Sequence, residues 1–204
     1  METKRITVVA AGLSEPSSTR MLADRLAEAT EGALLEHEVA AEITVVELRT
    51  LAVDIASMMV TRVETAAVQE AIKQVVEADA IIAVTPTFTM SYSGLFKSFF
   101  DLVDKDALTG VPVLLGATGG TARHSMVLDT AMRPLFAYLK AAVIPTGVYA
   151  ASEEWATSGL SNRVQRAGRE LASVIRNLPR ARATDPFDPE GADFETFDQL
   201  IGRS

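Results

Sequence analysis

The sequence contains no cysteine and only two histidines among its 204 residues. The lack of cysteine excludes disulfides, thiolate catalysis and cysteine-ligated metal or iron–sulfur centres. His37 and His124 lie far apart and show no HExxH-type spacing, so we predict no dedicated metal site.

Positive charge and long apolar runs are also scarce. The chain carries 19 Lys and Arg against 27 Asp and Glu, a formal net charge of -8. It therefore lacks the cationic surface that nucleic acid or an anionic membrane requires. No apolar run reaches the ~18 residues of a membrane span. We expect a cytoplasmic protein that acts on small molecules, with neither nucleic acid nor membrane as a partner.

What the sequence does contain is a repeated alternation of apolar strands and amphipathic helices. Five such pairs, each strand apolar throughout, indicate a parallel sheet buried on both faces. We predict an α/β fold: a doubly wound, five-stranded parallel sheet in three α/β/α layers, with the flavodoxin-like order 2-1-3-4-5. The expected strands are 5–11, 43–48, 80–85, 111–117 and 142–149, and the expected helices are 17–32, 64–77, 94–101, 122–140 and 161–178, with an irregular stretch at 52–60.

The character of the chain changes after Pro179. Residues 184–204 contain six acids and one basic residue, a composition typical of a solvated tail. The same stretch carries five large apolar residues, which indicate docking on the domain or on a neighbouring subunit. We therefore predict one domain at 1–180 and an acidic C-terminal tail at 181–204, and leave both tail interpretations open.

The most informative segment joins the apolar strand at Ala80–Thr85 to the helix that follows Gly94. At the carboxyl end of a parallel strand the loop backbone leaves the ladder, and the next helix points its amides at whatever lies there. Hydroxyl residues, a stiffening proline and Gly94 suit a planar ligand with polar edges. The alternative interpretation is a plain connection in which Ser93 caps the helix. The candidate ligand residues of this loop two are Pro86, Thr87, Phe88, Thr89 and Ser93.

Loop one follows the first strand and contains a cluster of hydroxyl residues where the first helix begins. Unpaired amides and the helix dipole make such a place suitable for one phosphate. The loop matches neither the dinucleotide GxGxxG pattern nor the P-loop pattern, which disfavours dehydrogenase and NTPase functions. Capping of the helix by Ser17 or Ser18 is the structural alternative. The candidate phosphate ligands are Ser14, Ser17, Ser18, Thr19 and Arg20.

Loop three follows the fourth strand and places the pair Gly119-Gly120 where main-chain amides can face a ligand without an intervening Cβ. Thr118 precedes the pair. His124, near the next helix start, is a candidate proton donor or phosphate contact, or only a polar contact. All three loops follow carboxyl ends of strands, so we expect them to converge at one edge of the sheet.

At these loops the chain resembles the NADPH-dependent FMN reductases of the flavodoxin-like superfamily, particularly those that supply reduced flavin to two-component monooxygenases. The resemblance is carried by Thr85–Phe88 with Ser93–Lys97, and by Ala117–His124 continuing to Ala131–Leu135. It implies FMN and NADPH, or NADH, as the cofactors.

The resemblance also implies a role for each loop. Loop one would hold the FMN phosphate, loop two the ribityl chain and ring, and Thr118, Gly119 and Gly120 the pyrimidine edge. Many family members begin loop one with Gly-Ser-x-Arg, whereas this chain has Glu15 at the place of the arginine. Arg20 or Arg123 is the expected substitute for the missing cation.

The implied reaction passes a hydride from the nicotinamide C4 to flavin N5 when the two rings stack, so we expect no catalytic side chain, with His124 as an auxiliary at most. Reduced flavin would leave for a partner monooxygenase. The family's fourth helix commonly forms subunit contacts, and the apolar segment Ala131–Leu139 predicts a homo-dimer or homo-tetramer.

Two other functions remain open from the sequence. An FMN-bound quinone, azo-dye or metal-ion reductase of the same fold would keep its flavin and reduce a different second substrate. A non-enzymatic electron carrier of the flavodoxin type, or a phosphoacceptor receiver module, would not oxidise NADPH. Against the carrier, loop three offers no aromatic for the flavin, and Thr85-Pro86 stands where a receiver needs its aspartate.

Overall fold

The computed structural model describes residues 2–178, so the tail predicted at 181–204 lies outside the described residues. Five parallel strand positions form the main sheet, in the order β2-β1-β3-β5-β6, with β7 also paired to β5. This is the predicted flavodoxin-like order. The strands are β1 (Thr3–Ala10), β2 (Ala40–Glu47), β3 (Ala80–Phe88), β5 (Pro112–Gly119), β6 (Ala142–Val143) and β7 (Val148–Ala151).

The last predicted strand is divided in two. Both β6 and β7 pair with β5 in parallel, and residues 144–147 lie between them. Pro145 falls in this gap, and because proline has no N–H to donate, it interrupts a sheet ladder. The two short strands therefore together occupy the fifth position of the sheet.

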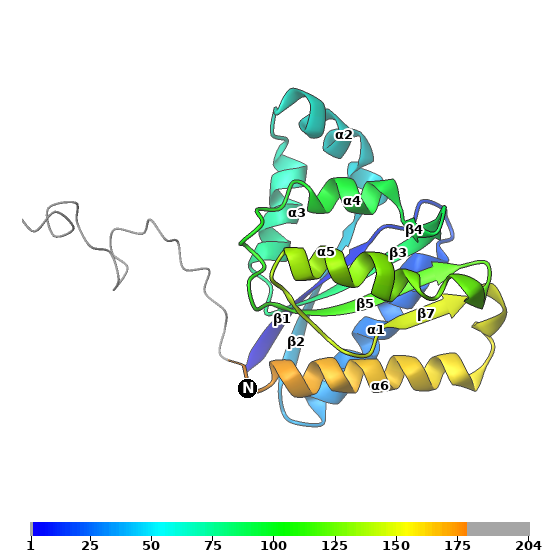
Figure 1. Ribbon diagram of the computed structural model, residues 1–204. Helices are drawn as coiled ribbons and strands as arrows, with labels where there is room; N and C mark the ends of the chain where they lie inside the picture. The colour runs from blue at the N-terminus through cyan, green and yellow to red at the C-terminus, as the bar shows by residue number, and fades with distance from the viewer. Residues whose placement is uncertain (1, 179–204) are drawn as a thin grey trace, which may run out of the picture.

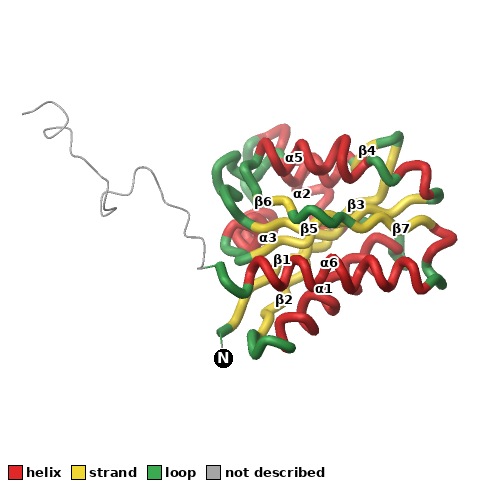
Figure 2. Tube along the Cα trace, turned by 60° about the horizontal axis from the view of Figure 1, so that its bottom comes forward, coloured by secondary structure: helices red, strands yellow, loops and turns green. Residues whose placement is uncertain are grey.

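Helices cover both faces of the sheet, as Figures 1 and 2 show. One face packs on α1 (Ser18–Leu35) and α6 (Ser158–Ile175). The other packs on α2 (Ala52–Thr61), α3 (Ala66–Val76), α4 (Gly94–Phe100) and α5 (Arg133–Tyr138). Successive β1 residues alternate between these two cores, with Ile6 and Val8 in the first and Val9 in the second. Burial on both faces explains why the strands are apolar throughout.

The two helices of the first face approach each other very closely. A Cβ built on Gly168 of α6 would lie 2.6 Å from the Ala29 carbonyl carbon of α1. Real Cβ atoms do not come so near to backbone, so the α1–α6 packing requires glycine at this position.

Three local predictions were wrong. Residues 52–60, expected to be irregular, form α2 after a 3-10 turn at Leu48–Leu51. The expected helix 122–140 is broken into a 3-10 turn at Ala122–His124, a π-helical turn at Leu128–Met132 and α5. Pro134 lies in the first turn of α5, where its missing N–H costs no hydrogen bond. Loop two contains an unexpected strand, β4 (Ser91–Tyr92).

None of the helices within residues 2–178 combines the length and the apolar character needed to cross a bilayer.

Candidate functional site

The carboxyl ends of β1, β3, β5 and β7 meet at one edge of the sheet, and the predicted loops leave from there (Figure 1). The Ala11 amide donates to the Val84 carbonyl at 2.9 Å, which places loop one beside the end of β3. Pro86 of β3 lies opposite Thr118 of β5, and Gly119 lies opposite Ala151 of β7. The predicted convergence of the three loops is confirmed.

Loop one is shaped by Ser17, which caps α1: its Oγ accepts from the Arg20 amide at 3.2 Å. Ser14 Oγ donates to the Pro16 carbonyl at 3.0 Å. A Cβ on Gly12 would lie 1.9 Å from Ser17 Oγ, so only glycine lets the loop close on this cap. The first turn of α1 contains no acid, and its amides at Ser18 and Thr19 have no acceptor within the helix. This end of α1 can accept an anion.

Two predicted ligand hydroxyls bind each other instead. Thr19 Oγ1 and Thr118 Oγ1 lie 2.9 Å apart in a hydrogen bond, and the two residues are only 2% and 3% exposed. The prediction that these hydroxyls contact the phosphate and the pyrimidine edge therefore gives way to a structural role, because the pair fastens loop one to the end of β5. Their main-chain groups remain part of the edge.

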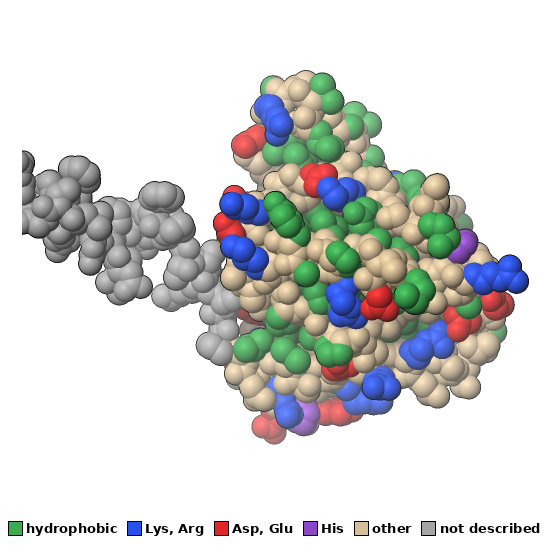
Figure 3. Space-filling model, in the orientation of Figure 1, with side chains coloured by type: hydrophobic (Ala, Val, Ile, Leu, Met, Phe, Trp, Pro, Cys, Tyr) green, Lys and Arg blue, Asp and Glu red, His purple; other side chains and the backbone are tan. Residues whose placement is uncertain are grey.

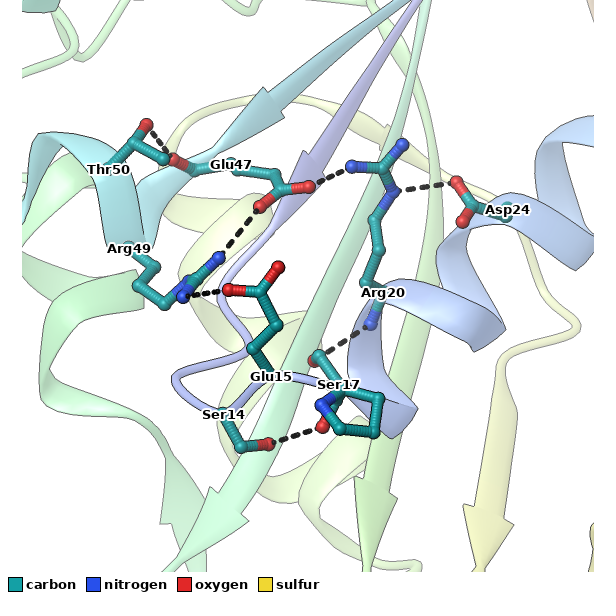
Figure 4. A network of polar contacts seen from close by, with 9 residues as sticks. Ser14, Glu15, Ser17, Arg20, Asp24, Glu47, Arg49 and Thr50 are labelled. Carbon is teal, nitrogen blue, oxygen red and sulfur yellow. Dashed lines mark hydrogen bonds and ion pairs between the residues drawn. The ribbon is translucent and has the colours of Figure 1, made fainter.

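Arg20 does not take the place of the missing loop arginine. Its Nε donates to Asp24 at 2.7 Å, its other end pairs with Glu47, and Figure 4 shows the side chain directed away from the loop. The hydrogen bond with Asp24 raises the pKa of Arg20 above its ordinary value. Arg20 is therefore held away from the place predicted for the phosphate. Arg49, which the sequence reasoning missed, instead pairs with Glu15 at 2.9 Å.

Loop two forms a β-hairpin with a two-residue turn. Thr87 pairs with Tyr92 and Phe88 with Ser91, while Thr89 and Met90 both have left-handed backbones, with φ of 47° and 66°. A type I′ turn requires positive φ at both central positions, which residues other than glycine or asparagine adopt only under strain. The hairpin leaves Phe88 47% exposed at the site.

Thr87 and Ser93, both predicted ligand residues of loop two, differ in their hydrogen bonds. Ser93 is buried, and its Oγ accepts from the Phe96 amide at 3.2 Å, so it caps α4 as the structural alternative proposed. Its own amide donates to Thr85 Oγ1 at 3.0 Å. Thr87 Oγ1 is buried and makes no hydrogen bond of normal geometry among the described residues, yet its interaction with the neighbouring Tyr149 hydroxyl partly offsets the rise that burial causes in the pKa of that phenol. The Thr87 hydroxyl is therefore incompletely satisfied within the protein, and a ligand at the edge can offer it a better partner.

Loop three is positioned by Tyr149, a second residue that the sequence reasoning missed. The Tyr149 hydroxyl donates to the Thr121 carbonyl at 2.9 Å, and burial raises the pKa of this phenol. A Cβ on Gly119 would lie 2.1 Å from that hydroxyl, whereas one on Gly120 would meet nothing within 4 Å. The first glycine therefore accommodates the tyrosine, and only the exposed second one is open toward solvent.

His124 is half-buried at the end of the short 3-10 turn that Thr121 caps.

Arg49 and Tyr149, the two residues that the sequence reasoning missed, could have been found by the rule that located the loops. Arg49 follows the carboxyl end of the second predicted strand, and Tyr149 ends the fifth.

Comparisons with known proteins match this arrangement. The family model for NADPH-dependent FMN reductase covers residues 4–156. The NADH-dependent FMN reductase SfnE of Pseudomonas putida is 36% identical over 169 residues, 82% of this chain and 88% of that protein. The FMN reductase (NADPH) of Pseudomonas aeruginosa is 33% identical over 169 residues, 83% of this chain and 88% of that one.

Solved structures match as well. An oxidoreductase from Corynebacterium diphtheriae superposes with a TM-score of 0.84 at 43% identity, over 88% of this chain and all of that one. A WrbA-like flavodoxin from Agrobacterium tumefaciens superposes with a TM-score of 0.57 at 18% identity, over 85% of this chain and 98% of that one, a likeness of fold alone.

Proposed function

The chain belongs to the NADPH-dependent FMN reductase family, and from this premise we propose that it is an NAD(P)H-dependent oxidoreductase that reduces FMN at the edge formed by its three loops. The observation that carries the proposal is the convergence of an anion-accepting helix end, the Thr87–Phe88 hairpin segment and a glycine loop at one edge of the sheet. The names of the relatives include NADH as well as NADPH, so the proposal admits either nucleotide as the hydride donor.

The residues at this edge fit FMN. The amides of Ser18 and Thr19, together with Ser14, would hold its phosphate at the start of α1. Thr87 and the exposed ring of Phe88 would contact the ribityl chain and the flavin ring. Main-chain groups of Gly119 and Gly120 would contact the polar ring edge. Pro86 and Thr89, the remaining predicted contacts, belong to the same hairpin segment.

When bound, FMN supplies a ring that accepts a hydride from a nicotinamide stacked on it. The chain's own contribution is to hold and align the ligands, because a transfer between two stacked rings gains its rate from position. The fixed parts of the site serve this end: the Thr19–Thr118 bond, the Ser17 cap and the Tyr149–Thr121 bond each immobilise one loop. Substitutions at the edge should therefore weaken ligand binding more than they remove a chemical group.

Flavin titration combined with NAD(P)H oxidation tests the function. We expect the purified protein to bind one FMN per chain and to oxidise NAD(P)H only when FMN is added. Protein that arrives yellow and shows ping-pong kinetics with a quinone would identify the prosthetic-group reductase instead. If the protein binds FMN but oxidises no NAD(P)H with any acceptor, the result would contradict the enzymatic function and favour an electron carrier.

We also propose a homo-oligomer formed through α4 and α5. An open groove of about 750 Å³ lies between them, lined by apolar residues that include Phe100, Pro134 and Leu135 and by the charged residues Lys97, Asp101 and Lys105. Tyr138 at its border is 73% exposed, and Figure 3 shows hydrophobic side chains on this face. Exposed apolar surface of this kind commonly marks a protein interface, and a second copy of the chain is the occupant that the family resemblance suggests.

Light scattering after size exclusion tests the oligomer. We expect a mass two or four times the 21.8 kDa of one chain. Tyr138→Glu should reduce the mass to that of one chain, because a charge buried at an apolar contact is left unpaired. Leu35→Glu, which alters an exposed apolar residue at the end of α1, is the matched control and should leave the mass unchanged. A monomeric wild type would defeat the proposal.

A monooxygenase that consumes the reduced flavin, and a cytoplasmic location, stay predictions. The first is supported by the family resemblance and the second by the composition of the chain.

A further inference from the structure

The side chains beside loop one form a row of alternating charges (Figure 4). Glu15 pairs with Arg49 at 2.9 Å, Arg49 approaches Glu47 at 3.8 Å, and Glu47 pairs with Arg20, which also binds Asp24. Three carboxylates thus stand against two guanidinium groups. The surroundings of the proposed phosphate site carry a net negative charge, which is unfavourable for a bound dianion.

The two arginines of this row differ in what they face. Arg20 is held between two carboxylates and points away from the loop. Within residues 2–178, Arg49 is the only cation that the structure pairs with a side chain of residues 11–17. Arg49 is therefore the cation positioned to bind a phosphate at loop one, and its guanidinium is already paired with Glu15.

The bond between Glu15 and Arg49 is a weak one. Their side chains are 77% and 35% exposed, and ion pairs in contact with water contribute little to stability. An anion at the loop can therefore compete with Glu15 for the guanidinium. The same exposure means that the Glu15 carboxylate repels that anion across water.

We propose that Glu15 lowers the affinity of the site for the flavin phosphate, both by repelling it and by holding Arg49, so that FMN exchanges as a substrate. The inference rests on the proposed function. It assigns an affinity-setting role to the one acid of loop one. It further predicts that the effect depends on the phosphate and on the net charge of the Glu15–Arg49 pair.

The test measures the dissociation constants of oxidised FMN and of riboflavin, which lacks the phosphate, by quenching of flavin fluorescence. Four proteins are compared: wild type, Glu15→Gln, Arg49→Gln and the double variant. At low salt we expect Glu15→Gln to bind FMN about three- to tenfold more tightly, as the removal of one exposed charge near a dianion predicts. Arg49→Gln should bind FMN more weakly by a similar factor, and the double variant should resemble the wild type. Riboflavin affinity should stay the same throughout.

Salt and a remote charge variant provide the controls. The differences should shrink at about 1 M salt, where the Debye length falls to about 3 Å. Glu36→Gln removes the same charge at the far end of the 18-residue α1, about 27 Å away, and should change nothing. An unchanged FMN affinity in Glu15→Gln, or an equal change for riboflavin, would overturn the inference. A wild type that binds neither flavin would instead defeat the proposed function.

Discussion

Replacing Gly119 by alanine is expected to weaken FMN binding at least about tenfold, equivalent to about 1.4 kcal/mol. The new methyl group would lie 2.1 Å from the Tyr149 hydroxyl and 3.6 Å from Thr87 Cβ. Overpacking of this kind costs about 1–3 kcal/mol, because neighbouring groups must shift. The shift falls on the Tyr149–Thr121 bond that positions loop three and on the hydroxyl proposed to contact the ligand. Equilibrium FMN titration measures the loss of affinity.

A second substitution shows whether the collision with tyrosine is the cause. Tyr149→Phe removes the oxygen that the methyl group would meet, so Gly119→Ala/Tyr149→Phe should recover a large part of the lost affinity. Gly120→Ala is the matched control, since its Cβ would have no neighbour within 4 Å, and should bind nearly as the wild type does. Equal losses at both glycines would show that the backbone, and not the tyrosine, demands glycine here.

Replacing Gly168 by alanine is expected to lower the free energy of unfolding by about 3 kcal/mol, at the upper end of overpacking costs. The Cβ would lie within 2.6–2.8 Å of the Ala29 carbonyl carbon, the Ala29 Cβ and the Thr30 amide nitrogen. Two of these atoms belong to the backbone, so relief requires α1 and α6 to move apart. For a chain of this size the melting temperature should fall by about 6–12 °C, measured by calorimetry and by urea unfolding.

Gly32→Ala in α1 is the control for that substitution. It also places alanine inside a long helix, but its Cβ would meet nothing within 4 Å. Alanine should leave stability unchanged or raise it by up to about 1 kcal/mol, since it forms helix more readily than glycine. If Gly168→Ala behaved like Gly32→Ala, the close α1–α6 packing would not exist in solution.

Much of the fold could be predicted because it depends on patterns that are local in the chain. Apolar runs such as Ile81–Val84 require burial on both faces, and the alternation with helices then requires parallel strands. The helices with clear periodicity were placed correctly, α1 and α3 among them. The breaks in the helix expected at 122–140 could not be predicted from periodicity, because its apolar spacing persists across residues that are not α-helical.

The site was predicted only as far as loops can be located. Hydroxyl residues after strand ends identified the edge, yet residue type does not reveal which group a hydroxyl binds. Ser17 and Ser93 cap helices, and Thr19 binds Thr118, a residue 99 positions away. Tyr149 of β7 and Arg49 of the 3-10 turn after β2 reach the site from segments with no marked composition.

The α/β class, the strand order, the converging loops and the family to which they point follow from patterns in the amino-acid sequence. Which side chains meet at the site depends on the folded arrangement, in which Thr87 lies beside the Tyr149 hydroxyl and Glu15 binds Arg49. The physical reason is that burial and periodicity act along the chain, whereas hydrogen bonds and ion pairs depend on the direction of each side chain. Residues that are distant in sequence become neighbours only once the sheet has formed.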